Sequence, residues 1–373
     1  RDVLFQVLTF SLIVALIAFI VANTITNLEI NKKTVGYGFL ARESRFAIGE
    51  SLIAFTPASS FGRAVLVGFL NTLQVSLYGI VLATVVGITV GILSLSGNWL
   101  VRRVLGGYVS FMRNIPVILH LVLWYSAITT LMPSHRQALQ PVPGVFLSQR
   151  GLMFPVPFEA PGWWLAGAGL ALAVLLSLEL GWFARRRMEL TGQRIAQAWP
   201  TVGLLIGLPL AGWLLGGAPT ALSVPELKGF NFRGGADFSP ELIAVLTGLT
   251  LYTAAYISEI TRSGILAVPH GQIEAGRSLG LSEGVVMRKV VLPQALRVII
   301  PPLTSQYLNL TKNSSLSVII GYPDLVSIAN TIMNPTGTEI EMISIIMIVY
   351  LTTSLTTSLV MNLYNRSVQL KER

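Results

Sequence analysis

Residues 64–101 read AVLVGFLNTLQVSLYGIVLATVVGITVGILSLSGNWLV, a run between Arg63 and Arg102 that contains no charged side chain. A helix needs about 20 apolar residues to cross the hydrocarbon core of a bilayer. The run exceeds that length and therefore predicts a membrane span. Its apolar residues are continuous and do not alternate with polar ones. This favours a helix, which pairs its backbone polar groups internally within lipid.

Composition extends this interpretation to the whole chain. Hydrophobic residues make up 53% of the 373 residues and charged residues only 12%, with a mean hydropathy of +0.68. Soluble domains carry about a quarter charged residues. The formal net charge of +9 would suggest nucleic acid in a soluble protein, but here the arginines flank apolar runs and favour a role in membrane topology. There is no cysteine and the three histidines are scattered, so we predict no metal site.

Further charge-free runs predict about eight transmembrane helices in an all-α integral membrane protein. The first run is long enough to span, so we do not interpret it as a cleavable signal peptide. Besides the span within 64–101, we expect spans near 3–25, 104–131, 161–183, 199–217, 241–262, from about 291, and 341–364.

The distribution of Lys and Arg predicts the orientation. With the N-terminus inside, fifteen of these residues fall in cytoplasmic segments and nine outside, which favours both termini in the cytoplasm. Pro- and Gly-rich residues 132–160 and 218–240 read as outer loops around the fourth and fifth spans. We divide the chain into an N-terminal span and outer segment (1–63), a first core part (64–131), inserted outer loops with two extra spans (132–240), a second core part (241–365) and a cytoplasmic tail (366–373).

Residues 269–290 form a short polar segment between two apolar runs. Pro269 and Gly271 should end the sixth span. The residues that follow are good helix formers, and Gly280 suits a helix stop. Ser282 can cap a second helical piece. We therefore expect two short helices at the cytoplasmic surface.

This segment has the features of a docking surface. Glu274 lies near the start of the first predicted helix, where the helix dipole favours a carboxylate that remains free to pair with a basic group on a partner. The small residues Ala275 and Gly276 would let a partner approach the backbone closely. The alternative is an ordinary solvated loop.

The segment resembles a known signature. Glu274-Ala275-Gly276, Gly280 and, nine residues later, Val290-x-Leu292-Pro293 are similar to the Glu-Ala-Ala-x3-Gly-x9-Ile-x-Leu-Pro loop of permease subunits of bacterial ATP-binding-cassette importers. Gly276 and Val290 depart from the signature. More of the chain resembles the polar amino-acid branch of that family, and the extra spans resemble the larger permeases of general L-amino-acid importers. The supporting motifs are Gly68–Leu73, Arg113–Pro116, Tyr256–Ile265, Leu292–Arg297, Lys312–Leu316, Arg136–Ala138 and Arg150–Leu152.

The resemblance implies a fold and a function. The fold would be a type I importer permease core with two extra helices inserted. The chain would move polar or general L-amino acids into the cell by alternating access, as a multi-pass protein of the bacterial inner membrane. Its implied partners are a second, different permease chain, cytoplasmic ATP-binding subunits and a periplasmic amino-acid-binding protein. The residues implied to couple to the ATPase are Glu274, Ala275, Gly276, Gly280, Leu292 and Pro293.

The resemblance also implies that ATP and Mg²⁺ are bound by the partner ATPase and that this chain holds no cofactor and is not an enzyme. The chain has no Gly-Lys-Ser/Thr phosphate loop. Three rival functions are a secondary amino-acid transporter driven by ions, an intramembrane enzyme and a scaffold subunit without a path of its own. The enzyme would need paired carboxylates or His ligands within spans, which the sequence does not offer.

Three charged residues lie within or at the ends of predicted spans: Arg113, Glu259 and Lys312, the last ending a span that we expect Pro301 and Pro302 to interrupt. A charge in a span costs several kcal/mol unless it faces a partner, water or a site. These charges either pair with one another or with the second permease, or they line the path of a zwitterion. Asn313 and Ser314 are further polar candidates for that path.

Two pairs of glycines have the Gly-x-x-x-Gly spacing that lets helices pack closely in membranes. They are Gly87 with Gly91 and Gly203 with Gly207. We expect both pairs to set close contacts between helices.

Overall fold

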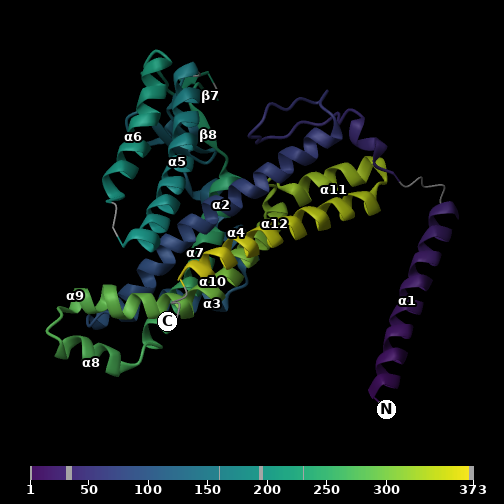
Figure 1. The fold of residues 1–373 in the computed structure, drawn as a ribbon. Coiled ribbons are helices and arrows are strands. Elements are labelled where there is room, and N and C mark those ends of the chain that lie inside the picture. Colours follow the sequence, from purple (N-terminus) through teal and green to yellow (C-terminus); the bar gives the residue numbers. More distant parts are fainter. Residues whose placement is uncertain (1, 31–35, 159, 193–195, 230, 369–373) are drawn as a thin grey trace. The chain divides into compact units, whose positions relative to one another are not determined.

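The structure is a computed structural model that describes residues 2–30, 36–158, 160–192, 196–229 and 231–368. Residues 369–373 of the predicted cytoplasmic tail lie outside the described residues. The chain divides into two compact units, one formed by residues 1–127 with 241–373 and the other by residues 128–240. The described part is mostly helical (Figure 1), which confirms the predicted fold class.

The first unit contains the long helices that flank residues 128–240 in sequence. These are α1 (Asp2–Ile30), α2 (Phe61–Leu93), α3 (Trp99–Asn114), most of α4 (Val117–Leu131), α7 (Pro240–Leu266), α10 (Leu292–Asn313), α11 (Leu325–Thr336) and α12 (Glu339–Val368). Short 3-10 helices η1 (Tyr37–Ala41) and η4 (Ser314–Ile320) precede α2 and α11. Phe39 of η1 packs with Phe61 and Ile332 in a buried cluster that joins this region to α2 and α11.

Among the described residues, six helices are long and apolar enough to cross a membrane, namely α1, α2, α5 (Pro161–Thr191), α6 (Ala198–Leu215), α7 and α12. Two bent helix pairs would raise the number to eight if each pair is one span. The span predicted near 104–131 corresponds to one of these bent pairs, in which α3 and α4 meet at an angle of 107°. The bend lies at Ile115-Pro116. Proline disfavours helical backbone in the residue before it, and Ile115 is extended.

The second bend differs from expectation. The sequence placed an interruption at Pro301 and Pro302, but α10 runs through both prolines. The chain bends instead by 52° between η4 and α11. Gly321 ends η4 with a φ of +83°, a backbone conformation that glycine adopts at little cost.

Close packing joins α2 to α7. A Cβ added to Gly87 would lie 2.6 Å from Cβ of Ile257, and one added to Gly91 would lie 2.7 Å from the carbonyl oxygen of Ser258. Only glycine permits this approach, so the close contact predicted from the spacing is confirmed. Near the other end of α2, the buried amide of Asn71 donates hydrogen bonds of 2.9 Å to the carbonyl oxygen of Pro323, before α11, and to that of Glu50.

The second unit combines the hairpin of α5 and α6 with short antiparallel strands. Its main sheet has the order β1 (Leu139–Val142), β2 (Val145–Ser148), β3 (Gly151–Phe154) and β8 (Ala236–Phe238). Two smaller ribbons pair β4 (Val156–Pro157) with β5 (Leu222–Ser223) and β6 (Glu226–Lys228) with β7 (Asn231–Arg233). A short 3-10 helix, η2 (His135–Gln137), precedes them. These residues were expected to form loops. Some of the strands pair within local hairpins, as Phe146 opposite Met153 shows, and others pair with distant residues, as Leu152 opposite Phe238 shows.

Glycines also pack α5 against α6, but they are not the predicted pair. A Cβ added to Gly203 or Gly207 would meet nothing within 4 Å, so the expectation for that pair is wrong. The close approach occurs at Gly169, whose added Cβ would lie 2.5 Å from the carbonyl oxygen of Leu208, and at Gly162 facing Gly216. Spacing alone does not tell which side of the helix faces its neighbour.

Candidate functional site

Residues 269–290 form two short helices, as predicted. These are α8 (His270–Ser278) and α9 (Glu283–Val286), and a π-helical turn, η3 (Met287–Val291), leads directly into α10. Pro269 precedes α8 and cannot itself continue a helix from α7. Gly280 has a φ of +74° and turns the chain between the two helices, as expected of a glycine helix stop.

Contacts within the segment hold the two helices together. Nε of Arg277 donates a hydrogen bond of 2.8 Å to Oε1 of Glu283, and this bond raises the pKa of Arg277. The amide of Leu281 donates to the carbonyl oxygen of Gly276 at 3.3 Å. Ser282 stands at the N-cap of α9 but its side chain makes no capping hydrogen bond, which differs from the prediction.

The structure explains why Gly276 stands where the importer-permease signature has alanine. Gly276 is buried, and a Cβ added there would lie 3.1 Å from Cγ2 of Val286 on α9. That distance is tighter than nine in ten real Cβ contacts, so an alanine would displace Val286 by a few tenths of an ångström. Gly276 therefore lets α8 and α9 pack more closely than the signature's alanine would.

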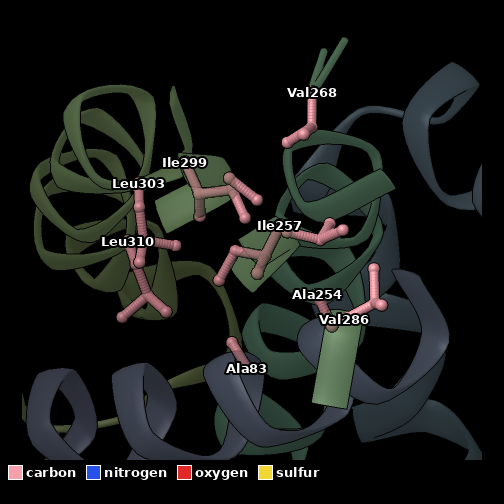
Figure 2. Close-up of a cluster of buried hydrophobic side chains, with 10 residues drawn as sticks. Ala83, Ala254, Ile257, Val268, Val286, Ile299, Leu303 and Leu310 are labelled. Atoms are coloured by element: carbon pink, nitrogen blue, oxygen red, sulfur yellow. The ribbon is translucent and has the colours of Figure 1, made fainter. Parts of the chain in front are cut away.

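The helix pair is joined to the spans by a buried cluster, which we call the coupling core. Val286 of α9 and Val291 of η3 pack in it with Ile257 of α7 and Ile299 of α10. Figure 2 shows Val286, Ile257 and Ile299 among the labelled side chains of this cluster. The other buried members are Ala83, Ala254, Val268, Ala295, Leu303 and Leu310. Because protein interiors are close-packed, this cluster is a physical connection through which α9 could act on α7 and α10.

The remaining predicted coupling residues lie on α8 and at the start of α10. Glu274 and Ala275 are exposed, and the neighbouring Leu279 exposes 79% of its surface. Glu274 is not free as predicted, because its Oε1 lies 2.9 Å from Nδ1 of His270, one turn away. Both side chains remain accessible to a partner. At the start of α10, Leu292 is exposed and Pro293 is half-buried.

Two of the predicted path residues meet in one cavity of about 570 Å³. Arg113 lies in the last turn of α3, and its guanidinium lies 5.2 Å from the ring centre of Tyr256 on α7. Glu259 lies one turn further along α7 and pairs with Arg262 at 2.9 Å. Other lining residues are Ser94, Arg102, Leu105, Gly106, Val109, Ser110, Asn114 and Ser258.

The structure does not bring the remaining path candidates to this cavity. Lys312 at the end of α10 is exposed, and Asn313 is half-buried. Ser314 is buried and donates a hydrogen bond of 2.7 Å to the carbonyl oxygen of Thr311. Sequence reasoning missed Arg262, although a cation three residues after Glu259 on a helix was the available signal.

The long apolar helices are those of an integral membrane protein. The polar helices α8 and α9 pack against these helices through the coupling core. Comparison with known proteins identifies the class further. Residues 194–370 match the family "Binding-protein-dependent transport system inner membrane component".

Curated relatives cover the full chain. It is 47% identical over 375 residues to the putative amino-acid ABC transporter permease protein YhdX of Escherichia coli K12, covering 100% of this chain and 95% of that protein. It is 43% identical over 373 residues to the general L-amino acid transport system permease protein AapQ of Rhizobium johnstonii, covering 100% of this chain and 93% of that protein. A third relative, BztB of Rhodobacter capsulatus, is named a glutamate/glutamine/aspartate/asparagine transport system permease and is 38% identical over 405 residues, covering 100% of this chain and 95% of that protein.

The chain belongs to the permease subunits of amino-acid ATP-binding-cassette importers. It is therefore a multi-pass inner-membrane transport subunit. This assignment favours ATP-driven import over the ion-coupled alternative.

Proposed function

We propose that α8 and α9 are the surface on which an ATP-hydrolysing subunit of the importer docks. ATP and Mg²⁺ would be bound by that partner, and this chain would carry out no hydrolysis itself. The observation that carries the proposal is the coupling core, in which Val286 and Val291 of the surface segment are buried with Ile257 and Ile299 of the spans. The exposed Leu279 adds an apolar contact on the side that faces away from this core.

Nucleotide-driven closure of the partner would move α8 and α9 as one body. The Arg277–Glu283 hydrogen bond and the close contact of Gly276 with Val286 keep the two helices together during this motion. Through the coupling core the displacement reaches α7 and α10 and switches access to the path between the two sides of the membrane.

Membership of the family supports a proposal for the rest of the assembly. We propose a second, different permease chain beside this one and a periplasmic amino-acid-binding protein at the outer side. Both termini would lie in the cytoplasm, on the same side as α8 and α9. AapQ is named for general L-amino acids and BztB for glutamate, glutamine, aspartate and asparagine, which supports polar or general L-amino acids as the substrates of this chain.

The polar cavity is the proposed part of the substrate path in this chain. Arg113 offers a guanidinium to the substrate carboxylate, and Glu259 offers a carboxylate to the ammonium group. The Glu259–Arg262 pair is about one third exposed, so water reaches it and substrate can compete for either member. Lys312, Asn313 and Ser314 would contribute from another part of the path.

The docking surface is tested by co-purification with the cognate ATP-binding subunit. Three variants are compared with the wild type: Leu279→Asp, Gly280→Val and Glu274→Ala. We expect Leu279→Asp to abolish retention of the ATPase because it places a charge in the apolar contact. Gly280→Val should reduce retention because valine resists a φ of +74°. Loss of the exposed Glu274 should weaken retention less.

Two controls make the outcome specific. Gly280→Asn should retain the ATPase because asparagine tolerates left-handed backbone. Gly284→Ala lies on α9, where an added Cβ meets nothing within 4 Å, and should behave as the wild type. Retention of the ATPase by Leu279→Asp at the wild-type level would refute the docking surface.

A further inference from the structure

Helix α3 differs from the spans around it because it is amphipathic. Its apolar residues Leu100, Val104 and Phe111 are each more than half exposed. The other side of the helix carries Arg102 and Arg103, and residues 99–114 contain no Asp or Glu. An exposed apolar face opposite a basic face is typical of a helix that lies in the membrane–water interface.

The geometry of the neighbouring helices also favours a position of α3 in the membrane–water interface. The 107° angle between α3 and α4 places α3 close to the membrane plane when α4 runs across the bilayer. The start of α3 also shares a cavity with the ends of two spans, since Arg102 lines it together with Ser94, just after α2, and Arg262, near the end of α7. Helix α3 therefore begins at the level where α2 and α7 leave the membrane.

A groove runs along the basic side of α3. It encloses about 730 Å³ and is lined by Trp99, Arg102, Arg103, Gly106, Gly107 and Ser110. A Cβ added to Gly106 or Gly107 would meet nothing within 4 Å, so the space above these two glycines is free for a ligand. Tryptophan is enriched at the headgroup level of membranes, which suits Trp99 at the start of the groove.

The two guanidinium groups of the groove are available to an anion. Among the residues that the structure describes, Arg102 and Arg103 form no ion pair with a carboxylate. Glu259, the acidic residue of the adjoining cavity, already pairs with Arg262. The planar fork of an arginine side chain matches the oxygens of a phosphate group.

We propose that α3 is a binding site for an anionic phospholipid, with Arg102 and Arg103 on the headgroup phosphate and with Leu100, Val104 and Phe111 against the acyl chains. Charge complementarity selects an anionic headgroup. The exposed apolar face selects a lipid over a free phosphate ion, which shares the headgroup chemistry but has no chains. The proposal does not depend on the docking of an ATPase at α8 and α9.

Lipid binding to the purified full chain tests the site. Phosphatidylglycerol and phosphatidylcholine are titrated onto the protein in detergent micelles, and bound lipid is counted by native mass spectrometry. We expect phosphatidylglycerol to bind more tightly, and Arg102→Gln/Arg103→Gln to weaken it by roughly thirtyfold, since each basic residue near an anionic surface contributes about fivefold. Val104→Ser/Phe111→Ser should weaken binding of the lipid while leaving the two arginines in place.

The matched control is Arg186→Gln/Arg187→Gln, which removes the same charge at the end of α5 and should leave the binding of the first phosphatidylglycerol unchanged. An equal loss in both double variants would show general attraction to basic residues and overturn the site. Displacement of the lipid by an equimolar amount of inorganic phosphate would assign the groove to a free anion. Equal binding of the two lipids would also overturn the proposal.

Discussion

The two Gly-x-x-x-Gly pairs predict opposite responses to the same substitution. Replacing Gly87 and Gly91 by alanine places Cβ atoms 2.6 Å from Cβ of Ile257 and 2.7 Å from the backbone oxygen of Ser258, where ordinary contacts begin at 3.4 Å. The clash of nearly 1 Å involves backbone, so rotation of a side chain cannot relieve it. The helices α2 and α7 must separate, and overpacking of this kind costs about 1–3 kcal/mol.

The same double substitution at Gly203 and Gly207 meets nothing within 4 Å. Alanine is the better helix former by up to about 1 kcal/mol, so this variant should be slightly stabilised. The pairs have equal spacing and receive the same added atoms, and they differ only in what faces them. The comparison therefore isolates the packing of α2 against α7.

Thermal unfolding of the purified chain in detergent micelles, followed by circular dichroism, measures both variants. We expect the midpoint for Gly87→Ala/Gly91→Ala to fall by roughly 3–10 °C. The midpoint for Gly203→Ala/Gly207→Ala should stay level or rise. Equal midpoints for the two variants, or a fall confined to the Gly203 and Gly207 variant, would refute the reasoning.

Two further predictions concern polar groups. Asn71→Ala removes the buried amide that donates to the carbonyl oxygens of Glu50 and Pro323 and should destabilise the chain by about 1–3 kcal/mol. A loss of less than about 0.5 kcal/mol in denaturant titration would contradict the role of that amide. Glu259→Gln removes a partly exposed ion pair and should change stability by less than about 1 kcal/mol, yet reduce amino-acid uptake by the assembled importer severalfold. Unchanged uptake would remove Glu259 from the path, and loss of assembly would make its role structural.

The fold class and the helix pair were predictable because the signals for them are local. Hydropathy is averaged over about 20 consecutive residues, so a run such as 64–101 predicts a span without knowledge of its packing partners. The turn between α8 and α9 depends on Gly280 and its neighbours alone. The break before α4 was also local, at Pro116, but we interpreted the largely apolar residues on both sides of it as one span.

Features that depend on distant partners were harder to predict. The pairing of β3 with β8 joins residues separated by the whole α5–α6 hairpin. The polar cavity brings together residues of α3 and α7. The spacing of residues within either helix does not predict which residues of the other helix lie beside them. Lys312 does not line that cavity for the same reason. The position of a charged residue near the end of a span indicates how deep it lies in the membrane, but not toward which neighbouring helix its side chain points.

The residues of the first unit that flank residues 128–240 lie close together. Tyr125, just before it, donates a hydrogen bond of 3.2 Å from its hydroxyl to Oε1 of Glu241, just after it. A segment whose two ends are already held side by side behaves as a removable module. We therefore expect that a permease without residues 128–240 would need only a short linker between the positions of Tyr125 and Glu241.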